Sequence, residues 1–175
     1  MTMKIITITG PSGAGKDTVA RMLSEMTGYK VLCSYTTRPR RNGEVDGREH
    51  WFVNECNVLP EFRLAYTQYG GYEYWTSIAQ LSNMSIYVID EKALKEMRRN
   101  FPHLKVVSIY VDASERVRLS RGVSEERIAR DKGREQIPLE QYDFIFRNEN
   151  KSKIDLYTSV FYQLAKPLAL IYEEE

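Results

Sequence analysis

The 175-residue sequence predicts a three-layer α/β fold built on a mostly parallel sheet. Short apolar segments, often β-branched, alternate along the chain with amphipathic helical segments. The apolar runs are continuous rather than alternating with polar residues, which is typical of strands that are buried on both faces. A glycine-rich loop directly follows the first run. Because such sheets bind ligands at the carboxyl ends of their strands, we expect the functional residues at that edge.

Five segments have the character of buried strands. They span residues 4–9, 30–33, 85–89, 105–111 and 143–146. Helices are expected between and after these strands, because apolar residues recur there with a period near 3.6. The expected helices span residues 16–26, 91–100, 113–120, 124–132 and 151–166.

One stretch interrupts the alternation. Residues 34–77 are polar, rich in Arg, Gly and Tyr, and contain short strand-like pieces, so we interpret them as an inserted acceptor-binding lobe. The pieces span residues 50–53, 64–69 and 72–75. Residues 121–139 are rich in arginine. The chain is therefore predicted to be a single domain, 1–175, with a core made of residues 1–33, 78–120 and 140–175.

Composition excludes several classes of protein. The net charge of +1 argues against a nucleic-acid-binding protein, which usually has a clear basic excess. The sequence has no apolar run of the roughly 18 residues that span a membrane, and no signal peptide. Cys33 and Cys56 match no metal-ligand spacing and are read as reduced thiols. We expect a cytoplasmic protein, and no pattern points to a particular oligomeric state.

Residues 10–16 fit the phosphate-binding pattern G-x-x-x-x-G-K, between a predicted strand and a predicted helix. In this context, backbone N–H groups and the positive end of the helix surround phosphate oxygens, while the lysine reaches the β- and γ-phosphates. We therefore expect this loop to bind a nucleoside triphosphate. The residues expected to bind ATP here are Gly10, Ser12, Gly13, Ala14, Gly15, Lys16, Asp17 and Thr18.

Asp17 occupies the position where a Ser or Thr usually holds Mg²⁺. Its carboxylate suits the start of a helix, and it also suits a contact with Mg²⁺. Direct contact with phosphates would be repulsive, so we favour a contact through water. ATP and Mg²⁺ are the cofactors that this loop predicts.

Arg38 and Arg41, on either side of Pro39, can clamp a phosphate monoester with bidentate hydrogen bonds. They lie in SYTTRPRRNGEVDGREHWFV, residues 34–53. Together with the loop GPSGAGKDT, this segment resembles the guanylate kinase family, whose pattern reads roughly S-x-T-T-R-x-x-R-x-G-E-x-D-G-x-D-Y-x-F. His50 stands where the family has tyrosine.

The resemblance extends to GYEYWTS, residues 71–77, which is similar to the family's G-N-Y-Y-G-[ST]. It implies that Tyr74 donates its hydroxyl to the acceptor phosphate and that Thr76 faces the base beside Ser34. The family's strand after this segment ends in D-x-D, and Asp90 stands at the position of the second aspartate. The acceptor-binding residues that the resemblance implies are Ser34, Arg38, Arg41, His50, Tyr74, Thr76 and Asp90.

The segment RLSRGVSEE, residues 118–126, is similar to the family's lid entry, R-L-x-x-R-G-x-x-S-E-E, which implies that residues 121–139 form a lid. The resemblance implies that Arg121 and Arg130 fold over the phosphates and, with Lys16, stabilise the charge of the transition state. We interpret Arg127 and Arg134 as solvated charges. The run YDFIFRN, residues 142–148, resembles the last core strand of the family, which implies that Asn148 lies near the adenine of ATP.

The resemblance implies transfer of the γ-phosphoryl group of ATP to GMP or dGMP. Ala65 and Val88, however, stand where the family has a guanine-reading glutamate and an aspartate. A kinase for another small phosphorylated acceptor, such as a different deoxynucleoside monophosphate or ribose 1,5-bisphosphate, is therefore a serious alternative. A non-catalytic guanylate-kinase-like interaction module or a phosphate-loop hydrolase fits less well, because Lys16 and the paired arginines suit phosphoryl transfer.

Overall fold

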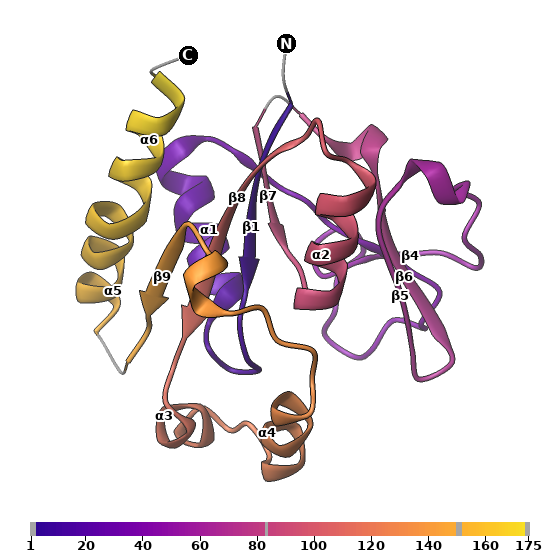
Figure 1. The fold of residues 1–175 in the computed structure, drawn as a ribbon. Helices are drawn as coiled ribbons and strands as arrows, with labels where there is room; N and C mark the ends of the chain where they lie inside the picture. The colour runs from indigo at the N-terminus through magenta and orange to yellow at the C-terminus, as the bar shows by residue number, and fades with distance from the viewer. Residues whose placement is uncertain (1–2, 83, 150–151, 174–175) are drawn as a thin grey trace.

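The computed structural model describes residues 3–82, 84–149 and 152–173. Its central sheet has five strands in the order β2-β7-β1-β8-β9, and every pairing between them is parallel (Figure 1). This arrangement confirms the predicted α/β class. The strands are β1 (Lys4–Thr9), β2 (Lys30–Val31), β7 (Met84–Val88), β8 (Lys105–Asp112) and β9 (Phe144–Arg147).

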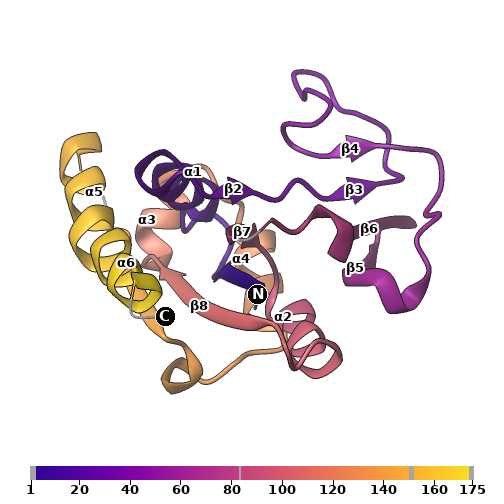
Figure 2. The same ribbon diagram turned by 90° about the horizontal axis from the view of Figure 1, so that it is seen from above.

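Helices cover both faces of this sheet (Figures 1 and 2). On one face lie α1 (Lys16–Thr27), α5 (Lys153–Val160) and α6 (Lys166–Glu173), and on the other lies α2 (Glu91–Asn100). Within β1, Ile6 and Ile8 belong to the apolar cluster with α1, whereas Ile5 belongs to the cluster with α2. Successive side chains of a strand point to opposite faces, so a strand buried on both faces is apolar throughout.

Local signals fix where several helices begin. Asp90 precedes α2, and its side chain accepts a hydrogen bond from the backbone N–H of Ala93 at 2.8 Å. Ser114 and Ser124 cap α3 (Glu115–Ser120) and α4 (Glu125–Lys132) in the same way. The helix predicted over residues 113–120 therefore begins two residues later than expected.

The segment that was predicted to be an acceptor lobe contains a second sheet, which lies to the side of the central sheet (Figure 2). Its order is β4-β3-β6-β5, with Trp75 buried and its ring stacked on Tyr35 at 5.7 Å between centroids. The sequence did not predict β3, because a two-residue strand shows no periodic pattern. The strands are β3 (Tyr35–Thr36), β4 (Trp51–Phe52), β5 (Arg63–Tyr69) and β6 (Tyr72–Ser77), and 3₁₀ turns η1 (Pro60–Phe62) and η2 (Ile78–Gln80) flank the β5–β6 hairpin.

The C-terminal helix extends further than residue 166. A π-helical turn, η4 (Phe161–Ala165), separates α5 from α6, and Pro167 lies in the first turn of α6. A proline usually marks a helix boundary, but the helix continues here because the wider π turn precedes it. Residue 151 of the predicted helix lies outside the described residues. No helix in the described part of the chain is long and apolar enough to cross a membrane.

Candidate active site

The loop at the carboxyl end of β1 needs glycine for both its conformation and its packing. Gly10, Gly13 and Gly15 have φ angles of +140°, +76° and +92°. A Cβ atom at Gly10 would overlap the carbonyl oxygen of Val111 in β8, and one at Gly13 would overlap a methyl group of Val123. The motif glycines therefore allow the loop to pass close to β8 and to the start of the 121–139 segment.

Lys16 begins α1, and its ammonium group lies across the loop. Nζ donates hydrogen bonds to the carbonyl oxygens of Gly10, at 2.8 Å, and Pro11, at 3.0 Å. Burial lowers the pKa of Lys16, and the positive charge of Arg134 acts in the same direction, while the carboxylate of Asp17 opposes both. The position of Lys16 is the one that the loop motif requires for contact with bound phosphates.

Asp17 is exposed, and Thr18, the next residue, is half-buried. The Asp17 carboxylate lines the large cleft beside the phosphate loop. Mg²⁺ in nucleotide-binding proteins is held by one or two carboxylates, by substrate phosphates and by water. Among the residues described, His, Cys, Asp and Glu side chains form no group of three that could hold a metal ion. The donor set therefore fits a Mg²⁺ ion that is held mainly by phosphates and water, with Asp17 beside it.

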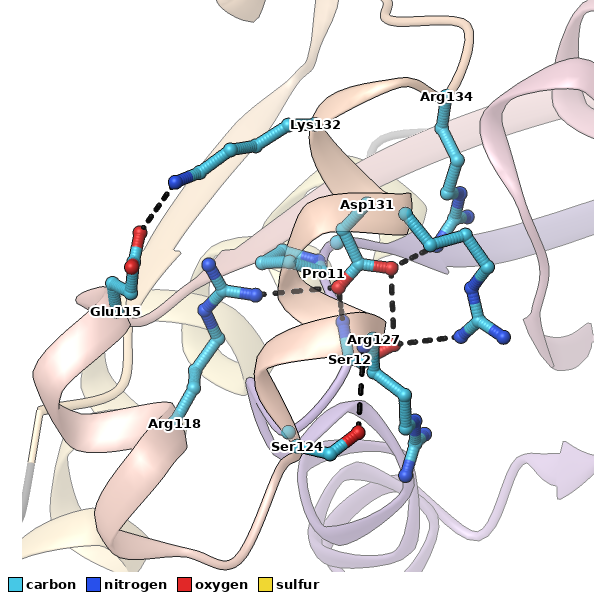
Figure 3. Close-up of polar contacts among 12 residues, drawn as sticks. Pro11, Ser12, Glu115, Arg118, Ser124, Arg127, Asp131, Lys132 and Arg134 are labelled. Atoms are coloured by element: carbon cyan, nitrogen blue, oxygen red, sulfur yellow. Dashed lines mark hydrogen bonds and ion pairs between the residues drawn. The ribbon is translucent and has the colours of Figure 1, made fainter.

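Ser12 is joined to α4 by a buried carboxylate (Figure 3). Asp131 accepts hydrogen bonds from the backbone N–H of Ser12 at 2.7 Å and from its hydroxyl at 3.1 Å. The same carboxylate forms ion pairs with Arg118 at 3.2 Å and with Arg134 at 3.4 Å. Burial alone would raise the pKa of Asp131, but the hydrogen bonds from Ser12 and the charge of Arg134 hold it below its usual value.

No local pattern in the sequence predicts this cluster. Arg134 lies in the turn that follows α4 and forms a second ion pair, with Glu91 at 2.8 Å. Its side chain is 29% exposed, so it is not the solvated charge that was expected. Asp131 stands beside Arg130 in a helix with other acidic residues, and nothing in the sequence distinguished it from them.

Arg121 and Asn148 brace the phosphate loop. The Arg121 guanidinium donates to the carbonyl oxygens of Gly13 and of Asn148, each at 2.9 Å. The side-chain amide of Asn148, which is buried, donates to the carbonyl oxygen of Ala14 at 2.7 Å. The structure thus places the side chains of both predicted residues in contact with the phosphate loop. Arg121 does not line the cleft described below.

Arg130 connects the 121–139 segment with the acceptor lobe. Its guanidinium donates to the hydroxyl of Tyr69, in β5, at 3.0 Å, and to the Ser12 hydroxyl at 3.5 Å. It also lies 5.8 Å from the centre of the Tyr69 ring. Tyr69 thus carries the contact between Arg130 and the lobe.

The two predicted clamp arginines differ in their surroundings. Arg38 is buried and forms a two-point ion pair with Glu44, with N–O distances of 2.8 and 3.0 Å. This pairing, with a hydrogen bond from the backbone N–H of Arg41, lowers the pKa of Glu44 to about 2. The side chain of Arg41 is exposed. Arg38 is therefore fixed in place before any acceptor binds, whereas Arg41 is not.

Ser34, His50 and Tyr74 form a contiguous group beside Arg38. The Ser34 hydroxyl and Nδ1 of His50 are 2.8 Å apart, and the His50 and Tyr74 rings meet edge to face. Burial lowers the pKa of His50, and the charge of Arg38 lowers it further. The imidazole is thus kept neutral, so that it takes part as a hydrogen-bonding group rather than as a cation.

One cleft of about 760 Å³ brings together residues from all three predicted parts of the site. The phosphate loop side contributes Asp17, the lobe contributes the clamp, and the 121–139 segment contributes three arginines. The predicted site residues that line it are Asp17, Arg38, Arg41, His50, Tyr74, Asp90 and Arg130. Arg127, which is exposed as expected, and Arg134, which is not, line it as well.

A smaller cavity of about 250 Å³ adjoins this cleft and is lined by Lys16, Ser34, Tyr74 and Asp90 among others. Ala65 and Val88, the two departures from the family pattern, are both on its wall. Thr76 is fully buried, and its hydroxyl donates to the hydroxyl of Tyr87.

Tyr87 lines the small cavity, whereas Thr76 does not. Burial raises the pKa of Tyr87 to about 12, so its hydroxyl stays protonated. Tyr87 was missed because the sequence places it inside a buried strand, where an aromatic residue is usually part of the core.

Known proteins of one family resemble this chain in sequence. The sequence model of guanylate kinase matches residues 2–154. The chain is 32% identical over 168 residues to a guanylate kinase of Rhodopseudomonas palustris (strain HaA2). The aligned region covers 82% of this chain and 74% of that protein.

Solved structures share the fold at lower identity. A guanylate kinase from Anaplasma phagocytophilum superposes with a TM-score of 0.63 at 20% identity, covering 95% of this chain and 86% of that one. A gluconokinase from Sinorhizobium meliloti gives a TM-score of 0.57 at 13% identity, covering 99% and 98% of the two chains. The match to the family over most of the sequence, together with the relative at 32% identity, shows that this chain belongs to the guanylate kinase family.

Proposed function

We propose that this protein transfers the γ-phosphoryl group of ATP to the phosphate of GMP or dGMP, with Mg²⁺ bound beside Asp17. As a member of the guanylate kinase family, the chain is a phosphotransferase that acts on nucleoside monophosphates. The observation that carries the proposal is the single cleft that is lined by Asp17, by Arg38 and Arg41, and by arginines of the 121–139 segment. A donor site and an acceptor site that share one cleft are what direct phosphoryl transfer requires.

On the donor side, the loop glycines leave backbone N–H groups at the positive end of α1, and Lys16 supplies a positive charge beside them. A bound Mg²⁺ would supply further charge stabilisation to the phosphates, with Asp17 as its protein contact through water. Arg121 and Asn148 maintain the shape of the loop. None of these residues needs to act as a nucleophile, because catalysis of this type depends on positioning and charge.

On the acceptor side, Arg38 is held by Glu44 in an orientation that leaves Arg41 and Tyr74 beside it along the cleft. We infer that these three groups bind the acceptor phosphate, with bidentate hydrogen bonds from the arginines. Arg130 reaches from α4 to Tyr69 at the tip of the lobe. Both residues line the cleft, and we infer that their contact helps to keep water from the transferred phosphoryl group.

The acceptor base is the part of the proposal for which a second candidate exists. A pocket that recognises guanine offers hydrogen-bond acceptors to the N–H groups of the base. A pocket that lacks these hydrogen-bond acceptors leaves the N–H groups unpaired. Ala65 and Val88 contribute only aliphatic groups to the small cavity. This observation favours, as the alternative, another phosphorylated acceptor, such as a different deoxynucleoside monophosphate or ribose 1,5-bisphosphate.

The test is an ADP-release assay with Mg²⁺–ATP and a panel of acceptors. The panel holds all common ribo- and deoxyribonucleoside monophosphates together with ribose 1,5-bisphosphate. The proposal expects the highest kcat/KM with GMP or dGMP, and the alternative expects it with another member of the panel. If ATP binds but no acceptor is phosphorylated, the kinase assignment itself is wrong and an interaction module becomes the better reading.

A further inference from the structure

Arg134 is held more firmly than an arginine on a solvated surface. Its guanidinium is paired with Glu91 at 2.8 Å and with Asp131 at 3.4 Å, and these two carboxylate side chains are only 4% and 6% exposed. Two buried carboxylates on different elements, α2 and α4, leave the guanidinium plane little freedom to rotate. An arginine that is fixed in this way loses little entropy when it binds a further ligand.

The position of Arg134 relative to both cavities is the second observation. Among the described residues, it is the only arginine or lysine that lines both the large cleft and the small cavity. Lys16 lines the small cavity too, and the charge of Arg134 is close enough to lower the pKa of Lys16. Arg134 therefore lies between the phosphate loop and the acceptor lobe, where a phosphoryl group must pass.

The guanidinium has hydrogen-bonding capacity beyond its two ion pairs. An arginine carries five N–H donors, and the bonds to Asp131 and Glu91 use one on each terminal nitrogen. Three donors remain for a ligand in the cleft. Phosphate oxygens are the ligands that such a fixed array of donors suits best.

We propose that Arg134 is a further phosphate-contacting residue, which binds the γ-phosphoryl group while it passes from ATP to the acceptor. This proposal rests on the proposed function. In the step concerned, an oxygen of the acceptor phosphate forms a new bond to the γ-phosphorus as the bond to the leaving oxygen of ADP breaks. Arg134 donates hydrogen bonds to the equatorial oxygens of that phosphorus, and it neither gives nor takes a proton.

Asp131 has the supporting role of a positioning residue. Its carboxylate is shared by Ser12 of the phosphate loop and by Arg134, so the loop and the arginine are fixed relative to each other (Figure 3). It also neutralises Arg118, whose side chain is buried. Removing Asp131 would leave Arg118 as an uncompensated buried charge, so a variant of Asp131 would mix loss of stability with loss of function.

The decisive variants therefore change Arg134 itself. Arg134→Lys keeps a positive charge for Glu91 but lacks the planar array of donors, and Arg134→Met removes both. The matched control is Lys132→Met, because Lys132 belongs to the same segment but pairs with Glu115 on an exposed surface, pointing away from Asp131 (Figure 3). For each protein we would measure kcat, the melting temperature, and the affinities for Mg²⁺–ATP and Mg²⁺–ADP by titration calorimetry.

We expect Arg134→Lys to melt close to the wild type but to lose about tenfold or more in kcat, since hydrogen bonds to charged groups carry effects of that size. ATP affinity should fall by about tenfold in both Arg134 variants, with ADP affinity unchanged, because only ATP carries the γ-phosphoryl group. Lys132→Met should match the wild type. The proposal is overturned if Arg134→Lys keeps its kcat and both variants keep the wild-type ratio of ATP to ADP affinity. The affinity ratio decides the role of Arg134 even if the wild type phosphorylates no acceptor, an outcome that counts against the proposed function alone.

Discussion

Gly10→Ala should weaken ATP binding by about 100-fold at a modest cost in stability. Gly10 has a φ of +140°, and a Cβ atom there would overlap the carbonyl oxygen of Val111 and lie 3.1 Å from its carbonyl carbon. That carbonyl belongs to β8, which is paired on both sides, with β1 and β9, so no side-chain rotation can relieve the overlap. The loop must therefore move away from β8.

Gly28→Ala gives a matched control with the same chemical change. Gly28 also has a positive φ, +73°, at the end of α1, but nothing lies within 4 Å of a Cβ atom there. Its cost is the left-handed conformation alone, about 1–2 kcal/mol, which corresponds to a fall in melting temperature of about 2–4 °C per kcal/mol for a chain of this size. Gly10→Ala also carries a free-energy cost for its positive φ, and in addition it displaces the loop.

The assay is thermal unfolding of both variants together with calorimetric titration of ATP. A displacement of about 1 Å in a binding loop is enough to cost about 100-fold in function, so we expect ATP affinity to fall by about that factor in Gly10→Ala. Gly28→Ala should bind ATP like the wild type. If Gly10→Ala bound ATP as tightly as Gly28→Ala does, the close approach of the loop to β8 would not matter for nucleotide binding, and the reasoning would be refuted.

Three further predictions concern the donor and acceptor sides. Lys16→Ala should abolish ADP release with any acceptor, and substantial residual turnover would show that its ammonium group is dispensable. Arg38→Ala should raise the KM for the monophosphate by about tenfold or more, given the strength of charge-assisted hydrogen bonds, and an unchanged KM would remove Arg38 from the clamp. The Glu44 carboxyl should titrate by NMR with a pKa of about 2 and move up toward 4.5 in Arg38→Ala. Because that folded-state pKa is depressed, the contribution of Glu44 to stability is present above pH 4.5 and is lost as the pH falls toward 2, so Arg38→Ala should lose less stability than the wild type over that range.

The fold was predictable because its signals are local. The first strand and the second helix, residues 4–9 and 91–100, were predicted with their observed bounds, since a continuous apolar run marks the strand and apolar residues on one side mark the helix. The short strand Tyr35–Thr36 was missed because its pairing with β6 arises from contacts far along the chain. The continuation of the last helix past Pro167 depends on a π turn that has no clear sequence signal.

Candidate site residues could be predicted where one segment carries the whole signal. The phosphate loop was predicted from its motif between a strand and a helix, and the Arg38–Arg41 pair from its spacing together with that loop and the family resemblance; their roles remain predictions. The contact of Asp131 with Ser12 joins residues that are 119 positions apart, so no local pattern reports it. Tyr87 lines the small cavity in place of the predicted Thr76. No local pattern reports this either, because it depends on how β6 meets β7.

The attachment of α4 has a consequence for its motion. Within α4 the buried side chains are Ile128 and Asp131, so the helix is held by one apolar side chain and by charges. Detaching it would expose little apolar surface and would therefore change the heat capacity only slightly. The opening of this helix should instead respond to the ions in the solvent, which compete for the released charges. We expect the rate of amide hydrogen exchange in residues 125–132 to rise with salt concentration, while exchange in the central strands stays constant.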